Sequence, residues 1–228
     1  MTVPLDPRPG RVRLAHGRPV EHRSRMAQVA AARSVSRSVR PLLEGPVRHG
    51  VGLGRGYVAV GDYCLALVPP GLPRMPNGIV CDLVVAVGEP VRVGAGRVST
   101  ASASTALGPD WDPVPVPRIQ LMIANRFTPD PVALAGRGDG LTPAGDDLLV
   151  GYAAGLVLFH GRRDRATAIA EAAAPRTTLL SATLLRHAAV GELPEPAHAF
   201  LEGGDPQPML RFGHSSGRAM LMGLALAC

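Results

Sequence analysis

Two adjacent aspartates, Asp146 and Asp147, are the residues of this sequence best placed to do chemistry. They end the segment 136-GRGDGLTPAGDD-147, and the apolar run 148-LLVGYAAGLVLF-159 follows at once. Adjacent carboxylates beside such a loop can hold a Mg²⁺ ion through water or position a proton. Glycine allows the backbone to take positive φ and to approach a ligand closely. We therefore treat both aspartates as candidate catalytic residues and tentative metal ligands, beside a candidate site for a small anionic substrate formed by Gly138, Gly140, Thr142 and Gly145.

The end of this segment has the pattern of a helix start. Thr142 fits the N-cap and Pro143 fits the first helical position. The N–H groups and the positive dipole end of such a start favour anions. Acids there also have a purely structural explanation, because each stabilises the helix dipole by about 0.3–1 kcal/mol. Both explanations remain open from the pattern of the cap alone.

The side of the helix on which the acids fall favours a functional role. Helical spacing places Asp146 above Leu149 on the apolar stripe, and it places Asp147 above Gly151 and Gly155. Glycines at that spacing form a groove that a second backbone can approach closely. Acids that only cap a solvated helix end do not need such neighbours.

Two other segments also have the pattern of helix starts. The first, 213-GHSSG-217, matches G-x-S-x-G, but none of the eleven residues after Gly217 is Asp, Glu or His. A hydrolase nucleophile needs those partners further along the chain, so we interpret Ser215 or Ser216 as a cap, with or without a bound anion. The second segment begins directly after Arg176, with Thr177 or Thr178 at the start of the helix. The candidate substrate-binding residues of these segments are Thr177, His214, Ser215 and Ser216.

Several other classes of site are excluded or disfavoured. The chain contains no Lys, which rules out the phosphate-binding motif GxxxxGK[ST], and the glycine run lacks the βαβ setting of a dinucleotide fingerprint. His160 and His187 have no Cys or His partner at ligand spacing, so we interpret both as structural. Cys64, Cys81 and Cys228 are odd in number and scattered, as expected of reduced thiols.

The charge distribution disfavours nucleic acid as a partner. All 24 basic residues are Arg; residues 1–48 have a net charge of +7 and the remaining residues a net charge of −1. No aromatic residues alternate with the arginines of that arm, as single-strand binding would require. The longest apolar run, 148–159, is too short to span a bilayer, and no signal peptide is apparent. We expect a cytoplasmic protein that binds neither nucleic acid nor membrane.

The arrangement of elements predicts an α+β fold, with a β-rich N-terminal half followed by an α-helical C-terminal half. We expect a disordered basic arm over 1–23, with Met26 as a possible true start. A subdomain with one helix (24–43) and several strands should span 24–130, and a helical subdomain carrying the GLTPAGDD loop should span 131–228. The expected strands are 57–60 and 63–68 joined by a Gly61-Asp62 turn, 79–87, VRV and RVS around 94–96, and 119–123. The expected helices are 143–160, 163–173, 177–190, 195–203 and 215–227.

The proline-rich segment 69-PPGLPRMPNG-78 should be a long loop, and such loops tend to carry function. The continuous apolar character of the longer strands predicts that they are covered on both faces.

Three segments together resemble the AllH-like family, which is associated with the oxamate carbamoyltransferase complex. These segments are 140-GLTPAGDDLLVG-151, 177-TTLLSATLLRHAAVGELPEP-196 and 213-GHSSGRAMLMG-223. The resemblance implies one component of a multi-subunit enzyme that transfers a carbamoyl group between carbamoyl phosphate and oxamate, giving oxalurate and phosphate in the purine-derived allantoin pathway. It also implies companion subunits, one of them resembling acyl-CoA synthetases. The alternative that remains is a non-catalytic structural or ligand-sensing subunit of a metabolic enzyme complex.

Overall fold

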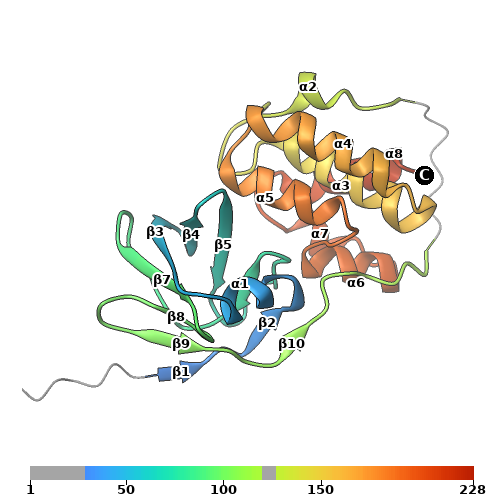
Figure 1. Cartoon of the computed structure of the whole chain (residues 1–228). Coiled ribbons are helices and arrows are strands. Elements are labelled where there is room, and N and C mark those ends of the chain that lie inside the picture. The colour runs from blue at the N-terminus through green and yellow to red at the C-terminus, as the bar shows by residue number, and fades with distance from the viewer. Residues whose placement is uncertain (1–28, 120–126) are drawn as a thin grey trace, which may run out of the picture.

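The computed structural model describes residues 29–119 and 127–228, and it confirms the α+β class. Figure 1 shows the strands of the N-terminal half on one side of the molecule and the helices of the C-terminal half on the other, with β5 and α5 at the boundary. Within the described ranges, no helix has the length and apolar character needed to cross a membrane.

The N-terminal half is a curled ten-stranded sheet with the strand order β1-β9-β8-β7-β3-β4-β5-β6-β2-β10. Only two residues separate β1 from β2, yet β1 pairs with β9 and β2 pairs with β6, so the sheet must curl. The elements are β1 (Val29–Ala31), β2 (Ser34–Ser36), the 3-10 turn η1 (Arg37–Val39), α1 (Arg40–Glu44), β3 (Arg48–Gly54), β4 (Tyr57–Val60), β5 (Tyr63–Val68), β6 (Gly78–Val80), β7 (Pro90–Gly94), β8 (Arg97–Ser99), β9 (Ser104–Ala106) and β10 (Asp110–Trp111).

The predicted hairpin at Gly61-Asp62 is confirmed, and the strands expected around residues 94–96 form a second hairpin. Val60 pairs with Tyr63 across the Gly61-Asp62 turn, and Gly94 pairs with Arg97 across the next turn. Strand β5 is covered on both faces, as its apolar run predicted. Its alternate side chains face two cores: Leu65 and Leu67 lie within the curled sheet, while Cys64, Ala66 and Val68 pack against the helices.

The C-terminal half is built around α3, which packs along α8. All five predicted helices are confirmed, and their ends agree with the prediction within two residues. Two short helices that begin with proline in their first turn were not predicted, α2 and α7. The elements are α2 (Pro131–Leu134), α3 (Ala144–His160), α4 (Arg163–Ala173), the 3-10 turn η2 (Ala174–Arg176), α5 (Leu179–Ala188), α6 (Glu195–Gly203), α7 (Gln207–Leu210) and α8 (Ser216–Leu226).

The expectation of one helix over 24–43 is wrong for the part that the structure describes. Residues 29–36 form β1 and β2, because the Ala32 N–H donates to the Ala106 carbonyl and the Arg33 N–H donates to the Val80 carbonyl. Tertiary pairing overrides helix propensity here. Pro41 lies in the first turn of α1 rather than ending a helix, since a proline has no N–H to satisfy at that point.

Two strand predictions also differ from the structure. The strand expected over 79–87 is confined to β6, and residues 81–88 turn away before β7 begins. In the segment expected as a strand over 119–123, Ile119 forms a bend and residues 120–123 lie outside the described residues.

Candidate functional site

Three helix starts, those of α3, α5 and α8, meet in the structure. The hydroxyls of Thr142 and Ser216 are 3.1 Å apart and join the starts of α3 and α8. The Thr178 hydroxyl donates to the Leu141 carbonyl at 2.7 Å and joins α5 to the glycine loop. The three sequence segments that carried the candidate residues therefore lie together.

The glycines of the loop are required by its geometry. Gly138 has a φ of 117°, and a Cβ there would lie 2.8 Å from the Ala144 nitrogen. A Cβ at Gly145 would lie 2.1 Å from the Leu134 carbonyl oxygen. The loop thus folds tightly against α2 and the start of α3, at contacts that a side chain would prevent.

Asp146 fixes the position of this loop. Its side chain is 0% exposed, and Oδ1 accepts from the Gly136 N–H at 2.8 Å while Oδ2 accepts from the Thr177 hydroxyl. The carboxylate therefore links the loop to the residues just before α5, and both of its oxygens have protein donors.

Asp147 lies in a different environment. It is 2% exposed, and its Oδ2 has no hydrogen-bond partner among the described residues. Burial raises the pKa of Asp147 from 3.8 to about 7; hydrogen bonds from Ser216 and Thr142 lower it and the charge of Asp146 raises it, each by less than burial does. At neutral pH this carboxyl group therefore exists in both protonation states, which suits an acid or base.

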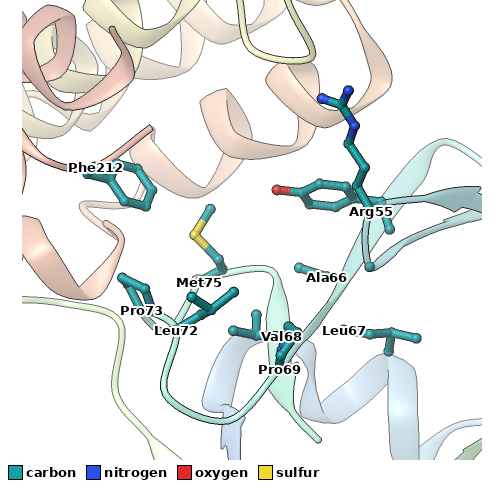
Figure 2. Close-up of a pocket in the computed structure, with 11 residues that line it drawn as sticks. Arg55, Ala66, Leu67, Val68, Pro69, Leu72, Pro73, Met75 and Phe212 are labelled. Atoms are coloured by element: carbon teal, nitrogen blue, oxygen red, sulfur yellow. The ribbon is translucent and has the colours of Figure 1, made fainter. Parts of the chain in front are cut away.

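A cavity of about 160 Å³ lies close to this site, at the boundary between the sheet and the helices. In Figure 2 Met75 lies between Phe212 and Ala66, and the Arg55 guanidinium points away from the apolar side chains. The Phe212 carbonyl accepts from the N–H of Gly217 at the start of α8. The cavity is lined by Arg55, Gly56, Tyr57, Ala66, Leu67, Val68, Pro69, Leu72, Pro73, Met75 and Phe212.

Tyr57 connects the cavity to the aspartate. Burial raises the pKa of the Tyr57 hydroxyl, and the nearby charges of Cys64 and Asp147 raise it further. Sequence reasoning missed Tyr57, because a strand residue 90 positions before Asp147 carries no pattern that links the two. The same reasoning did single out the loop 69–78, which supplies part of the cavity wall.

The other predicted residues are arranged around the helix starts. His214 is exposed in the turn before α8, and its side chain makes no hydrogen bond or ion pair among the described residues. Ser215 occupies the N-cap position of α8 without a side-chain capping bond. The prediction of Thr142 as N-cap is wrong by one residue: Pro143 holds that position, and the Thr142 hydroxyl is turned toward Ser216.

The tentative metal site stays a prediction. In residues 29–119 and 127–228 there is no group of three or more His, Cys, Asp or Glu side chains arranged to hold an ion. Asp146 uses both oxygens for protein donors, so Asp147 is the carboxylate with an oxygen left for a ligand.

The fold and the site together define an α+β protein with a candidate binding site where helix starts converge, in a helical half that packs against a curled sheet. In the comparison with protein families, residues 134–228 match the family described as AllH, oxamate carbamoyltransferase subunit AllH. The match runs from the end of α2 to the last residue, and it confirms the resemblance over the helical half. No curated protein and no solved structure matches the chain.

Proposed function

We propose that this protein is a subunit of a carbamoyltransferase-type complex and binds a small anionic substrate where α3, α5 and α8 begin. The description of the family matched by residues 134–228 supports the class of complex and implies companion subunits. One observation supports the location of the site: the Oδ2 atom of Asp147 is buried, lies beside the hydroxyls of Thr142 and Ser216, and has no hydrogen-bond partner in the part of the chain that the structure describes. A companion that resembles acyl-CoA synthetases belongs to the same proposal.

The helix starts supply the attraction for the anion. Their positive dipole ends favour a carboxylate or phosphate, and the hydroxyl of the Thr142–Ser216 pair that does not donate to the other can donate to it. A charged Asp147 would oppose an anion, but the raised pKa of about 7 keeps part of the population neutral at neutral pH.

In carbamoyl transfer to oxamate, the amide nitrogen of oxamate attacks the carbonyl carbon of carbamoyl phosphate. The new N–C bond forms, the C–O bond to phosphate breaks, phosphate leaves with the bonding electrons, and the nitrogen loses a proton. We assign the acceptance of that proton to Asp147 in its charged form. A base with a pKa near the working pH is efficient in this role, and the fixed helix dipoles stabilise the charge that develops on the leaving group.

Asp146 is a positioning residue in this proposal. Its two oxygens hold Gly136 and Thr177, so it fixes the loop and the start of α5 relative to Asp147. Its loss should therefore disturb the geometry of the site without removing the reacting group.

The test is the turnover of the complex reconstituted with its companion subunits and supplied with carbamoyl phosphate and oxamate. Asp147→Asn keeps the shape of the side chain and removes the base, so we expect kcat to fall by about 10²-fold or more with assembly unchanged. Asp139→Asn, which removes an exposed acid from the same loop, is the matched control and should leave turnover unchanged. Full activity of Asp147→Asn would rule out the catalytic assignment.

A non-catalytic subunit is the second candidate, and the full set of hydrogen bonds to Asp146 favours it. A carboxylate whose oxygens both accept from the protein is typical of a structural tether. In that case the Asp146→Asn variant should lose assembly with the companion subunits, and Asp147→Asn should retain turnover. Size-exclusion chromatography of each reconstituted mixture separates the two candidates.

A further inference from the structure

A hollow lined by two arginines lies on the outer face of the sheet, away from the helix starts. Strand register places Arg92 directly opposite Ser99, and it places Gly94 directly opposite Arg97. Val93 and Val98 point into the sheet core, so Arg92 and Arg97 project from the opposite face. In Figure 1 strands β7, β8 and β9 lie on the side of the molecule away from the helices of the C-terminal half.

The hollow has a volume of about 400 Å³. The wall at Gly94 is formed by the backbone before β3, since a Cβ at Gly94 would lie 2.6 Å from the Pro46 carbonyl oxygen and 2.8 Å from the Val47 Cα atom. The hydroxyls of Ser99 and Ser104 border the same space, and neither side chain makes a hydrogen bond in the described structure. The described lining residues are Val47, Arg92, Gly94, Ala95, Arg97, Ser99, Thr100, Ala103 and Ser104.

The charge of this hollow is not balanced by the protein. Neither Arg92 nor Arg97 forms an ion pair within the described residues, and no Asp or Glu is among the described lining residues. Two described acids of the N-terminal half, Glu44 and Asp110, both pair with Arg40. Two unpaired guanidinium groups with adjacent hydroxyls have the donor set that recognises phosphate or carboxylate oxygens.

We propose that this hollow, formed by Arg92, Arg97, Ser99 and Ser104, is a binding site for a small metabolite with phosphate or carboxylate groups. The two arginines contact separate oxygens of the ligand, and the serine hydroxyls donate to the same groups. A hollow of about 400 Å³ is of the size that small-molecule sites have. The described lining residues include no aromatic ring, so base stacking with a single-stranded nucleic acid has no support there.

The site is independent of the proposed carbamoyltransferase chemistry. It lies on strands outside residues 134–228, the part of the chain that matches the family. A ligand bound there can therefore be a regulator or a second substrate held apart from Asp147.

Isothermal titration calorimetry on the full chain tests the proposal with inorganic phosphate and with malonate as probes. We expect saturable binding of at least one probe, and the one that binds identifies the ligand's group. Arg92→Ser and Arg97→Ser should each weaken that binding by about tenfold or more, since a charge-assisted hydrogen bond is lost. Arg165→Ser is the charge-matched control, because it removes an exposed arginine from α4, and it should change the affinity less than about twofold.

Four outcomes would overturn the site. These are the absence of saturable binding by either probe, equal weakening by Arg165→Ser, loss of binding in Asp147→Asn, and binding of an oligonucleotide but of neither small anion. Loss of binding in Asp147→Asn would assign the anion to the helix starts instead. Because the arginines are exposed, thermal unfolding of each variant should match the wild type and verify that the fold is intact.

Discussion

At the scale of single residues, the two aspartates show how neighbouring side chains of one type acquire different roles. Asp146 is held by the Gly136 N–H and the Thr177 hydroxyl, whereas Asp147 keeps a buried oxygen without a hydrogen-bond partner among residues 29–119 and 127–228. The sequence predicted that both lie on the packed side of their helix. It could not separate their roles, because the partners of Asp146 lie ten and 31 residues away and are set by the fold.

The raised pKa of Asp147 predicts a specific dependence of stability on pH. The folded state binds the proton more tightly than the unfolded state, so this group's contribution to the free energy of unfolding is fully favourable below pH 3.8 and is lost as the pH rises to about 7. The shift of about three pKa units corresponds to up to about 4 kcal/mol. Asp147→Asn does not titrate, so its stability relative to the wild type should increase by up to that amount between pH 4 and pH 7.5.

Urea unfolding of both proteins at each pH measures this difference. The difference between the two proteins removes the contributions of all other titrating groups. Asp139→Asn, an exposed acid of the same loop, should show a difference that does not change with pH. A constant difference for Asp147→Asn as well would contradict the buried, unpartnered state of the carboxyl group.

At the scale of elements, the helices could be predicted far better than the first residues of the sheet. The helices carry local signals, namely caps, periodic apolar residues and terminal glycines, and α4 and α6 agree with the prediction at both ends. The strands β1 and β2 have no such signals, since they form only by pairing with β9 and β6. Tyr57 was missed for the same reason: only tertiary packing brings β4 near the start of α3.

The close packing of α3 on α8 depends on two glycines. A Cβ at Gly151 would lie 2.0 Å from the Met220 carbonyl oxygen, and one at Gly223 would lie 2.0 Å from the Leu148 carbonyl oxygen. Because both obstacles are backbone atoms, Gly151→Ala should lower the free energy of unfolding by about 1–3 kcal/mol, despite the higher helix propensity of Ala. It should also weaken the proposed ligand site, since α8 carries Ser216.

Gly203→Ala is the matched control for this prediction, because a Cβ at Gly203 in α6 meets nothing within 4 Å. Chemical denaturation should show an unchanged or slightly raised stability for this variant, by at most about 1 kcal/mol. Equal stabilities of Gly151→Ala and Gly203→Ala would show that α3 and α8 are further apart than the structure places them.

At the scale of the whole molecule, polar contacts join the sheet to the helices. The Tyr63 hydroxyl and His187 Nε2 are 2.8 Å apart, and the Cys64 N–H donates to the Thr183 hydroxyl at 3.0 Å. His187 Nδ1 also contacts Glu192 at 2.5 Å. The division into subdomains at residue 130 stays a prediction, and these contacts argue that the two parts are stable only together.

The protein should therefore unfold in a single cooperative transition. Trp111, the only tryptophan, lies in β10 and packs against His198 of α6, so its fluorescence reports on the boundary, while far-UV circular dichroism reports mainly on the helices. The two signals should have the same midpoint in a denaturant titration. His187→Ala leaves the Tyr63 hydroxyl without its His187 partner and leaves Glu192 with the Ser38 hydroxyl as donor. The free energy of unfolding should therefore fall by about 1–3 kcal/mol, and the midpoints of both signals should shift together. Separate transitions in the wild type would instead show that the helical half, which contains both aspartates and all three helix starts, folds without the sheet.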